Sequence, residues 1–163
     1  MSYWTHVYGT IRLHVPGMTQ RHKDFIVDEV LRHLPKVTGS EGDMRVCVMR
    51  EPGHSGSRFC DELGIKLKKS EPMQDIYLLT ISATMRDRFF DRTLREFSEW
   101  LCRLSKRLWV VDILMSVYDS LNSYMFDNPE PFASMYNEPN DDSESWTDWL
   151  WPSKTPYGGD RDE

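Results

Sequence analysis

Long apolar runs and paired cysteines are both missing from this 163-residue sequence. No stretch approaches the ~18 consecutive apolar residues that cross a bilayer, and the first residues lack the basic-then-apolar order of a signal peptide. The chain holds 3 cysteines, widely spaced and without a CxxC pair. This pattern argues against a disulfide framework and suits a reducing compartment. We therefore expect a cytoplasmic protein that does not enter a membrane.

Basic residues are scarce towards the C-terminus. Residues 119–163 carry 11 Asp or Glu and only 2 Lys or Arg, whereas residues 1–118 carry 15 and 18. The total charge of −6 is unlike that of a protein that binds long nucleic acids. A hydrophobic content of 39% is enough for one packed domain. We predict a folded domain over residues 1–118 and an acidic tail containing Pro and Trp over residues 119–163.

Hydrophobic periodicity predicts four strands and two helices. Alternation favours strands over residues 4–15, 44–51, 75–85 and 109–120. Apolar spacing of three and four residues favours one helix from the N-cap residue Thr19 to Pro35 and another over residues 90–108. The order β-α-β-β-α-β is the split βαβ or ferredoxin-like arrangement, an α+β fold. It has a four-stranded antiparallel sheet with both helices on one face; another α+β order of the same elements is the alternative.

The same periods predict which side chains face the core. In the two helices these are Phe25, Ile26, Val30, Leu34 and then Phe90, Leu94, Phe97, Leu101, Leu104 and Leu108. In the fourth strand they are Val111, Ile113, Met115 and Val117.

The first strand, WTHVYGTIRLHV, has two contrasting faces because successive side chains of a strand point to opposite sides. Val7, Ile11 and Leu13 belong to an apolar face that the helices would cover. The other face carries the candidate binding residues Trp4, His6, Tyr8, Arg12 and His14. Its expected neighbours on adjacent strands are Thr80, Ser82, Thr84, Arg45, Cys47, Asp112, Ser116 and Tyr118.

Three interpretations of this uncovered face are open. Exposed rings on a sheet bind bases in RNA-recognition modules, although the sequence signatures of those modules are missing here. One face of an antiparallel sheet is also commonly polar and solvated. In the third interpretation the acidic tail folds back over the face.

The segment GHSGSRFCDELG, residues 53–64, is a second candidate site. Its glycines and serines would let backbone N–H groups approach an anion, although it lacks the Walker pattern and an ordinary surface loop is the alternative. Its candidate ligand-binding residues are His54, Ser55, Ser57 and Arg58. The nearby Cys60 and Asp61 could join His54 on a metal, but no second pair of ligands follows. We expect neither a metal nor a cofactor.

The acidic tail contains the motif SESWTDWLWP. Trp146, Trp149 and Leu150 follow helical spacing, and Trp151 comes next. Three tryptophans in six residues are too apolar to stay in water without a partner. We expect these tryptophans either to dock on the domain or to anchor a partner protein as a short helix.

Several stretches resemble a group of small proteins from tailed bacteriophages. They are YWTHVYGTIRLHVPGMTQ, HLPKVTGSEGDM, GHSGSRFCDELG, EFSEWLCRLSKRL and NPEPF. The resemblance covers roughly residues 3–133 and leaves the acidic tail out. It implies an accessory protein made in the cytoplasm of an infected bacterium, where such proteins often counter host defences. It carries over no site residue.

The leading hypothesis is a non-enzymatic binding protein, an anti-defence factor that binds or inhibits a host protein. The alternative is a nucleotide sponge that uses the uncovered face and the serine-glycine loop. A phosphodiester-cleaving enzyme with His6 or His14 as general base comes third, because the sequence offers no acid partner or metal set. An unpaired edge strand would also permit a homodimer.

Overall fold

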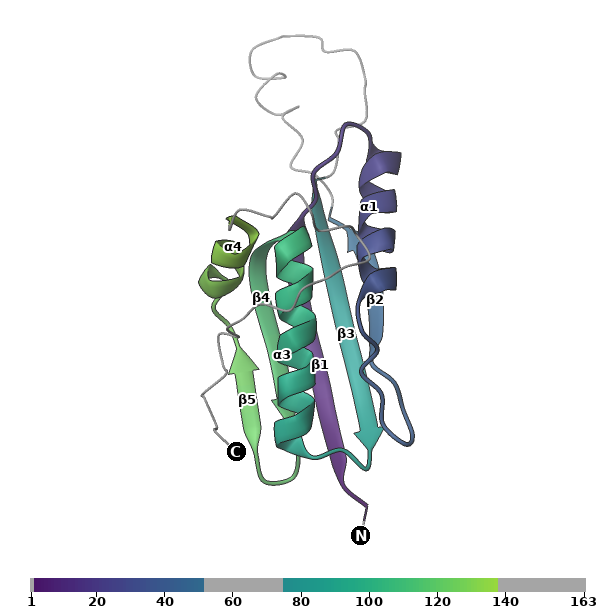
Figure 1. Cartoon of the computed structure of the whole chain (residues 1–163), viewed down its shortest axis with the longest axis vertical. Coiled ribbons are helices and arrows are strands. Elements are labelled where there is room, and N and C mark those ends of the chain that lie inside the picture. Colours follow the sequence, from purple (N-terminus) through teal and green to yellow (C-terminus); the bar gives the residue numbers. More distant parts are fainter. Residues whose placement is uncertain (1, 52–74, 138–163) are drawn as a thin grey trace, which may run out of the picture.

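The computed structural model describes residues 2–51 and 75–137, which form one five-stranded antiparallel sheet and three helices (Figure 1). The strands are β1 (Trp4–His14), β2 (Arg45–Arg50), β3 (Ile76–Arg86), β4 (Trp109–Tyr118) and β5 (Ser123–Phe126). The helices are α1 (Gln20–His33), α3 (Phe90–Arg107) and α4 (Glu130–Asn137). The strand order is β2-β3-β1-β4-β5, so the first strand of the sequence is the central one.

The α+β class and the four expected strands are confirmed, but the expected number of strands and helices is wrong. β5 and α4 lie within residues 119–137, which the sequence analysis assigned to the acidic tail. A short turn makes β5 possible, because the Asp119 carboxylate accepts hydrogen bonds from the backbone N–H groups of Leu121 and Asn122 at 2.8 and 2.6 Å. Phe126 and Phe132 then bury their rings completely. A four-residue strand is too short to show a clear period.

Helix α1 begins and ends where the sequence predicted. The Thr19 hydroxyl accepts a hydrogen bond from the backbone N–H of His22 at 3.1 Å, and the helix stops just before Pro35. Val27 and Val30 face the core. The expectation for Phe25 is wrong: its ring is 60% exposed because the buried stripe of α1 runs through residues 23, 27, 30 and 34.

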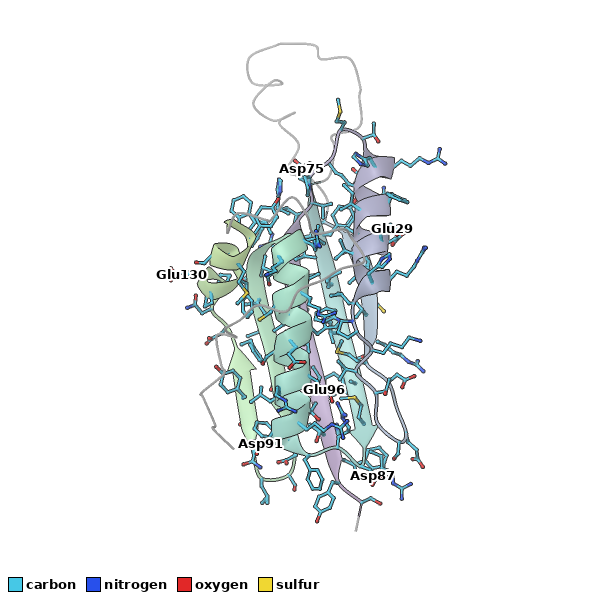
Figure 2. All side chains as sticks on the ribbon, in the orientation of Figure 1. Glu29, Asp75, Asp87, Asp91, Glu96 and Glu130 are labelled. Carbon is cyan, nitrogen blue, oxygen red and sulfur yellow. The ribbon has the colours of Figure 1, made fainter. Side chains whose placement is uncertain are left out.

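Lys23 belongs to that buried stripe although it is charged. Its ammonium group donates to the carbonyl oxygen of Val15 at 2.8 Å and pairs with Asp75 at 2.7 Å, just ahead of β3 (Figure 2). The side chain is only 4% exposed, so both partners are needed to offset the loss of water.

Helix α3 supplies the largest part of the helical core. Phe97, Leu101 and Leu104 are fully buried, and Leu108 at the C-cap is buried with them. Phe90 and Leu94, nearer the start, are half-buried. These side chains pack with Val7, Ile11 and Leu13, the apolar face of β1, in one core cluster. The predicted apolar stripe is therefore confirmed.

A β-bulge corrects the expected core face of β4. Arg12 pairs with Asp112, but the next residue, Leu13, pairs with Val110, so Val111 is an extra residue in β4. Val110 is buried, whereas Val111 is 38% exposed. An extra residue reverses the alternation of side chains on one side of the bulge. Because Val110 and Val111 are the same residue type, the sequence does not indicate which of them faces the core.

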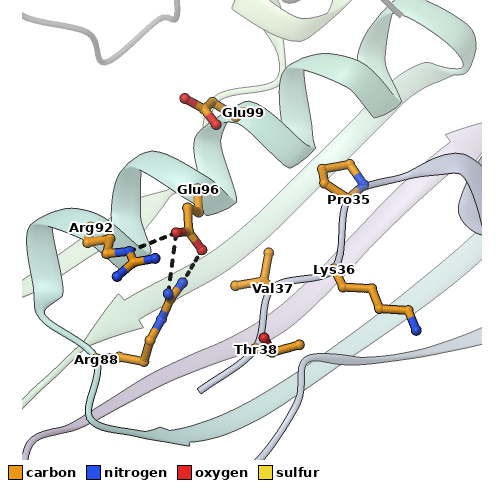
Figure 3. A pocket seen from close by; sticks show the side chains of 8 residues that line it. All are labelled: Pro35, Lys36, Val37, Thr38, Arg88, Arg92, Glu96 and Glu99. Carbon is orange, nitrogen blue, oxygen red and sulfur yellow. Dashed lines mark hydrogen bonds and ion pairs between the residues drawn. The ribbon is translucent and has the colours of Figure 1, made fainter. Parts of the chain in front are cut away.

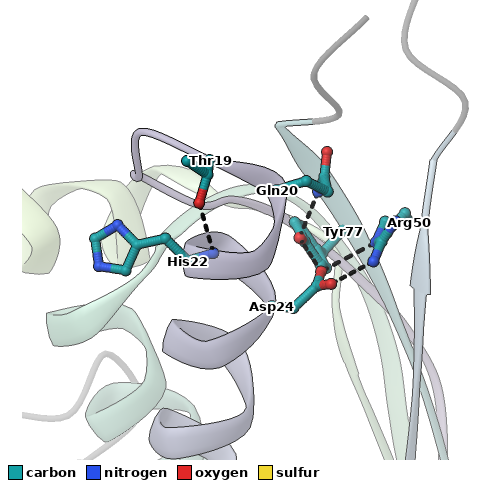
Figure 4. Close-up of polar contacts among 6 residues, drawn as sticks. All are labelled: Thr19, Gln20, His22, Asp24, Arg50 and Tyr77. Atoms are coloured by element: carbon teal, nitrogen blue, oxygen red, sulfur yellow. Dashed lines mark hydrogen bonds and ion pairs between the residues drawn. The ribbon is translucent and has the colours of Figure 1, made fainter. Parts of the chain in front are cut away.

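A hydrogen-bonded network fixes α1 to the sheet (Figure 4). The Asp24 carboxylate accepts hydrogen bonds from Arg50 of β2, with the Nε donor at 3.0 Å, and from the Tyr77 hydroxyl of β3. The same hydroxyl accepts a bond from Gln20 at 2.7 Å. Burial and the neighbouring Asp24 raise the pKa of Tyr77 to about 12, so the phenol stays protonated as a donor.

We expect Asp24→Asn to destabilise the fold at neutral pH and to have little effect in acid. The Arg50 hydrogen bond, helped by Tyr77 and opposed by burial, lowers the pKa of Asp24. A lowered pKa means that the carboxylate stabilises the fold fully above the ordinary value of 3.8 and less as pH falls through the folded-state pKa. Urea midpoints of the wild type and the variant, measured from about pH 7 to about pH 3, should converge at low pH. Asp28→Asn, an exposed change on α1, is the control, and a gap between the wild type and Asp24→Asn that stays constant in acid would contradict this account.

Candidate functional site

The candidate site is the face of the sheet that the helices leave free. In Figure 1 the helices α1 and α3 lie over the same side of the sheet. Within residues 2–51 and 75–137 the other side is not covered by a helix, and its side chains Tyr8, Leu114 and Tyr118 are exposed. We call that side the open face. Its central strands contribute Trp4, His6, Tyr8, Thr10, Arg12 and His14 from β1, Thr80, Ser82 and Thr84 from β3, and Asp112, Leu114, Ser116 and Tyr118 from β4.

Three rings gather at one end of the open face, and we call His6, Tyr8 and Tyr118 the ring cluster. His6 lies opposite Thr84 on one side and Tyr118 on the other. Its imidazole stacks on Tyr118 with centroids 4.9 Å apart and planes at 24°. The Thr84 hydroxyl lies 3.1 Å from Nδ1 of His6 and 2.8 Å from the Tyr8 hydroxyl. Cross-strand pairing thus holds these rings in fixed positions.

The ring cluster is exposed and has apolar neighbours. Tyr8 is 40% and Tyr118 is 37% exposed. Beside them, Leu114 of β4 and Met125 of β5 are 56% and 57% exposed. Trp4 lies two residues before His6 on the same face of β1 and is 40% exposed. Exposed apolar side chains gathered on one surface are a common feature of interaction sites, which makes this face a candidate.

Two of the arginines beside the rings, Arg12 and Arg86, already have acidic partners. Arg12 donates from Nε and Nη2 to the two carboxylate oxygens of Glu51 at 2.8 and 2.7 Å. This bidentate contact, assisted by the charge of Asp112, raises the pKa of Arg12. Arg86, opposite Trp4, donates to Glu41 at 2.7 Å. Arg45 on β2 is exposed, and no ion pair joins it to another described residue.

The other end of the open face is also aromatic. His14 and Trp109 pair across β1 and β4, with ring centroids 5.7 Å apart. Tyr136, near the end of α4, stacks on Trp109 at 6.5 Å with planes at 11°. Hence α4, which packs on the helix side through Phe132, also reaches the margin of the open face.

The structure brings together some predicted site residues and leaves others undescribed. Trp4, His6, Tyr8, Arg12 and His14 all lie on the open face, as alternation predicted. The loop residues His54, Ser55, Ser57 and Arg58, with Cys60 and Asp61, lie outside the described residues, and so do Trp146, Trp149 and Trp151. The described ranges contain no group of three His, Cys, Asp or Glu side chains that could hold a metal ion.

Leu114 and Met125 are surface residues of the site that were not predicted from the sequence. Leu114 lies opposite Thr10, and the alternation in DILMSVY could have placed it on the open face. Met125 pairs with Ser116 through β5, a strand that the sequence did not predict. The apolar character of the site was therefore underestimated.

The helix side contains a cavity lined by charged side chains (Figure 3). It has a volume of about 260 Å³ between residues 35–38 and helix α3. Arg88, whose side chain is 6% exposed, forms an ion pair with Glu96 there, and Glu96 also accepts a bond from Arg92 at 3.0 Å. Because these opposite charges satisfy one another, the cavity presents no single sign of charge to a ligand.

Comparison of the chain with family models, curated proteins and solved structures returns no match. Among the described helices, none combines the length and apolar character that crossing a membrane requires.

Proposed function

We propose that this chain is a non-enzymatic binding protein whose open face docks another protein. The observation that carries the proposal is the gathering of Tyr8, Tyr118, Leu114 and Met125, each more than a third exposed, on one rigid sheet surface. Tyrosine and tryptophan are enriched among the few residues that supply most of the binding energy at protein interfaces, because they bury a large area with few rotatable bonds. Trp4 extends the same surface.

The charges of the open face favour a protein over a nucleotide. A phosphate group needs an available cation, but Arg12 and Arg86 are engaged by Glu51 and Glu41. The rings of His6 and Tyr118 also stack on each other, which leaves less ring surface for a base. Apolar Leu114 and Met125 instead suit the apolar side chains of a protein partner.

A nucleotide is the second candidate, and Arg45 is the observation that favours it. Arg45 lies across β3 from Tyr8, since both pair with Ser82. A nucleotide that stacked its base on Tyr8 and placed its phosphate on Arg45 would pass over Ser82, which lies between them. This candidate predicts a rise in melting temperature with mononucleotides or cyclic dinucleotides that Arg45→Ala removes.

The biological setting is part of the same proposal. In the phage context that the sequence resemblance implies, the partner is a bacterial host protein and the chain an anti-defence factor. The finer fold description is proposed with it: β1 and β3 adjacent in the sheet, with β2 and β4 outside them, suit a ferredoxin-like unit extended by β5 and α4. Phosphodiester cleavage by His6 has less support, because the His6 imidazole already contacts Thr84 and Tyr118.

We expect Leu114→Asp to weaken partner binding strongly without unfolding the protein. The full-length chain is used to capture a stoichiometric partner from bacterial lysate, and the affinity of the purified pair is then measured by calorimetry. A buried, unpaired carboxylate at the interface should weaken binding at least roughly tenfold. Because Leu114 is 56% exposed in the free chain, the melting temperature should stay within about 3 °C of the wild type.

The matched control is Phe25→Asp, which puts the same charge on a 60% exposed apolar residue of α1. It should bind like the wild type. Equal binding by Leu114→Asp and the wild type, or loss of binding in the Phe25 control alone, would place the interface elsewhere. Failure to capture any bacterial protein, both by the wild type and by the full chain carrying Trp146→Ser, Trp149→Ser and Trp151→Ser, would overturn the proposed function.

A further inference from the structure

The described chain ends beside the open face. Tyr136, the residue before the last of α4, stacks on Trp109, and Trp109 contacts His14 of the central strand. The residues after Asn137 therefore start from the margin of the open face, at the end opposite the ring cluster.

The length of the remaining chain suits a return across this face. Trp146 follows Asn137 by nine residues, which can span up to ~30 Å when extended. Tyr8 lies six residues before His14 on the central strand, so the two residues are ~20 Å apart along it. Residues 146–151 are thus within reach of Leu114 and of the ring cluster beyond it.

The chemistry of the two surfaces is complementary. Residues 146–151, WTDWLW, hold three tryptophans and a leucine, and the open face exposes Leu114, Met125, Tyr8 and Tyr118. Indole rings pack well on tyrosine and methionine side chains. Residues 138–163 carry 8 Asp or Glu against 2 Lys or Arg, and Arg45 at the side of the open face is available to an acidic residue such as Asp148.

We propose that residues 146–151 bind the open face of their own chain, around Leu114. The tryptophans then cover apolar surface that would otherwise face water, and they cover the surface that the proposed function assigns to a partner protein. A partner must displace them, so the tail competes with it. That competition rests on the proposed function, whereas the docking itself does not.

A peptide in trans tests the docking. A fluorescent peptide of residues 138–163 is titrated with the full chain carrying Trp146→Ser, Trp149→Ser and Trp151→Ser, which frees the open face. A tether of this length corresponds to an effective concentration on the order of 1 mM, so the peptide must bind with a Kd below about 1 mM for the docked state to dominate. Adding Leu114→Asp to the receptor should weaken binding roughly tenfold or more, whereas adding Phe25→Asp should not. A Kd above about 1 mM, or equal weakening by both changes, overturns the proposal.

Nuclear Overhauser contacts in the unaltered full chain locate the tryptophans directly. We expect contacts from the indoles of Trp146, Trp149 or Trp151 to Leu114 or Tyr118, within one molecule. Contacts to the helix side, for example to Phe25, or no contacts with the described fold, contradict the proposal. In a mixture of differently labelled chains, contacts between molecules would show a second copy as the occupant and would also overturn it. None of these results depends on a host partner, so docking and the proposed function can fail separately.

Discussion

Replacing Gly9 by alanine is expected to prevent folding. Gly9 lies in the middle of the central strand, paired with Ile81 and Met115, and has a φ of +149°. A Cβ atom there would lie 2.0 Å from the carbonyl oxygen of Leu114 and 2.8 Å from Cα of Met115. Both contacts are with backbone, so relief requires β4 to move away from β1. The cost should exceed ~4 kcal/mol, a large part of the 5–15 kcal/mol that holds a typical domain together.

Far-ultraviolet circular dichroism during urea unfolding measures the effect. Gly9→Ala should show no cooperative transition, or one at a much lower urea concentration than the wild type. Thr10→Ala is the matched control, because Thr10 is the next residue of β1 and its side chain lies on the open face. The control should lose no more than ~1 kcal/mol of stability. A Gly9→Ala variant as stable as the Thr10 control would mean that β1 and β4 do not approach as closely as described.

Replacing Glu96 by glutamine should cost more stability than replacing its partner Arg88 by methionine. The Arg88 side chain is 6% exposed, and both terminal nitrogens donate to Glu96. Without the carboxylate charge, a guanidinium ion would stay buried beside a neutral amide, at a cost of about 3 kcal/mol. In Arg88→Met the buried charge disappears, and Glu96 keeps its bond to Arg92, so the loss should be only about 1 kcal/mol.

Unfolding free energies from urea titrations at neutral pH test this order. Arg92→Met is the control, because Arg92 is 64% exposed and its pair with Glu96 spans one helical turn; it should change stability by less than about 0.5 kcal/mol. If Arg88→Met were the more damaging change, packing of the arginine stem, rather than its charge, would dominate at this position.

Local periodicity was sufficient to predict most of the fold. The Thr19 cap, the apolar stripe of α3 and the alternation of β1 depend on neighbours three, four or two residues away, and all are confirmed. β5 could not be predicted because four residues form a strand only when β4 lies beside them. The bulge at Val111 likewise comes from pairing with β1.

The candidate site, too, was predicted from the sequence only in part. Alternation along β1 predicted that Trp4, His6 and Tyr8 lie on one side. The stacking of His6 on Tyr118 depends on the register between strands remote in sequence. Glu51 was predicted only as the last residue of the second strand. It follows β2, whereas Arg12 lies on β1, and β3 separates these two strands in the sheet, so their hydrogen bond forms only because both side chains are long enough to meet over β3. Such pairs follow from tertiary structure alone.

The two margins of the sheet differ in a way that bears on self-association. At one margin β5 pairs only with Met115–Tyr118 of β4, and α4 lies beside the earlier part of that strand through Tyr136 and Trp109. At the other margin β2 has β3 as its one neighbour among the described strands. A strand from another molecule that added to β2 would meet Arg45, which is exposed and forms no ion pair with another described residue, whereas Arg50 at the other end of β2 is bound by Asp24. An exposed charge on an edge strand disfavours the addition of a further strand, so Arg45 opposes the growth of fibres through β2.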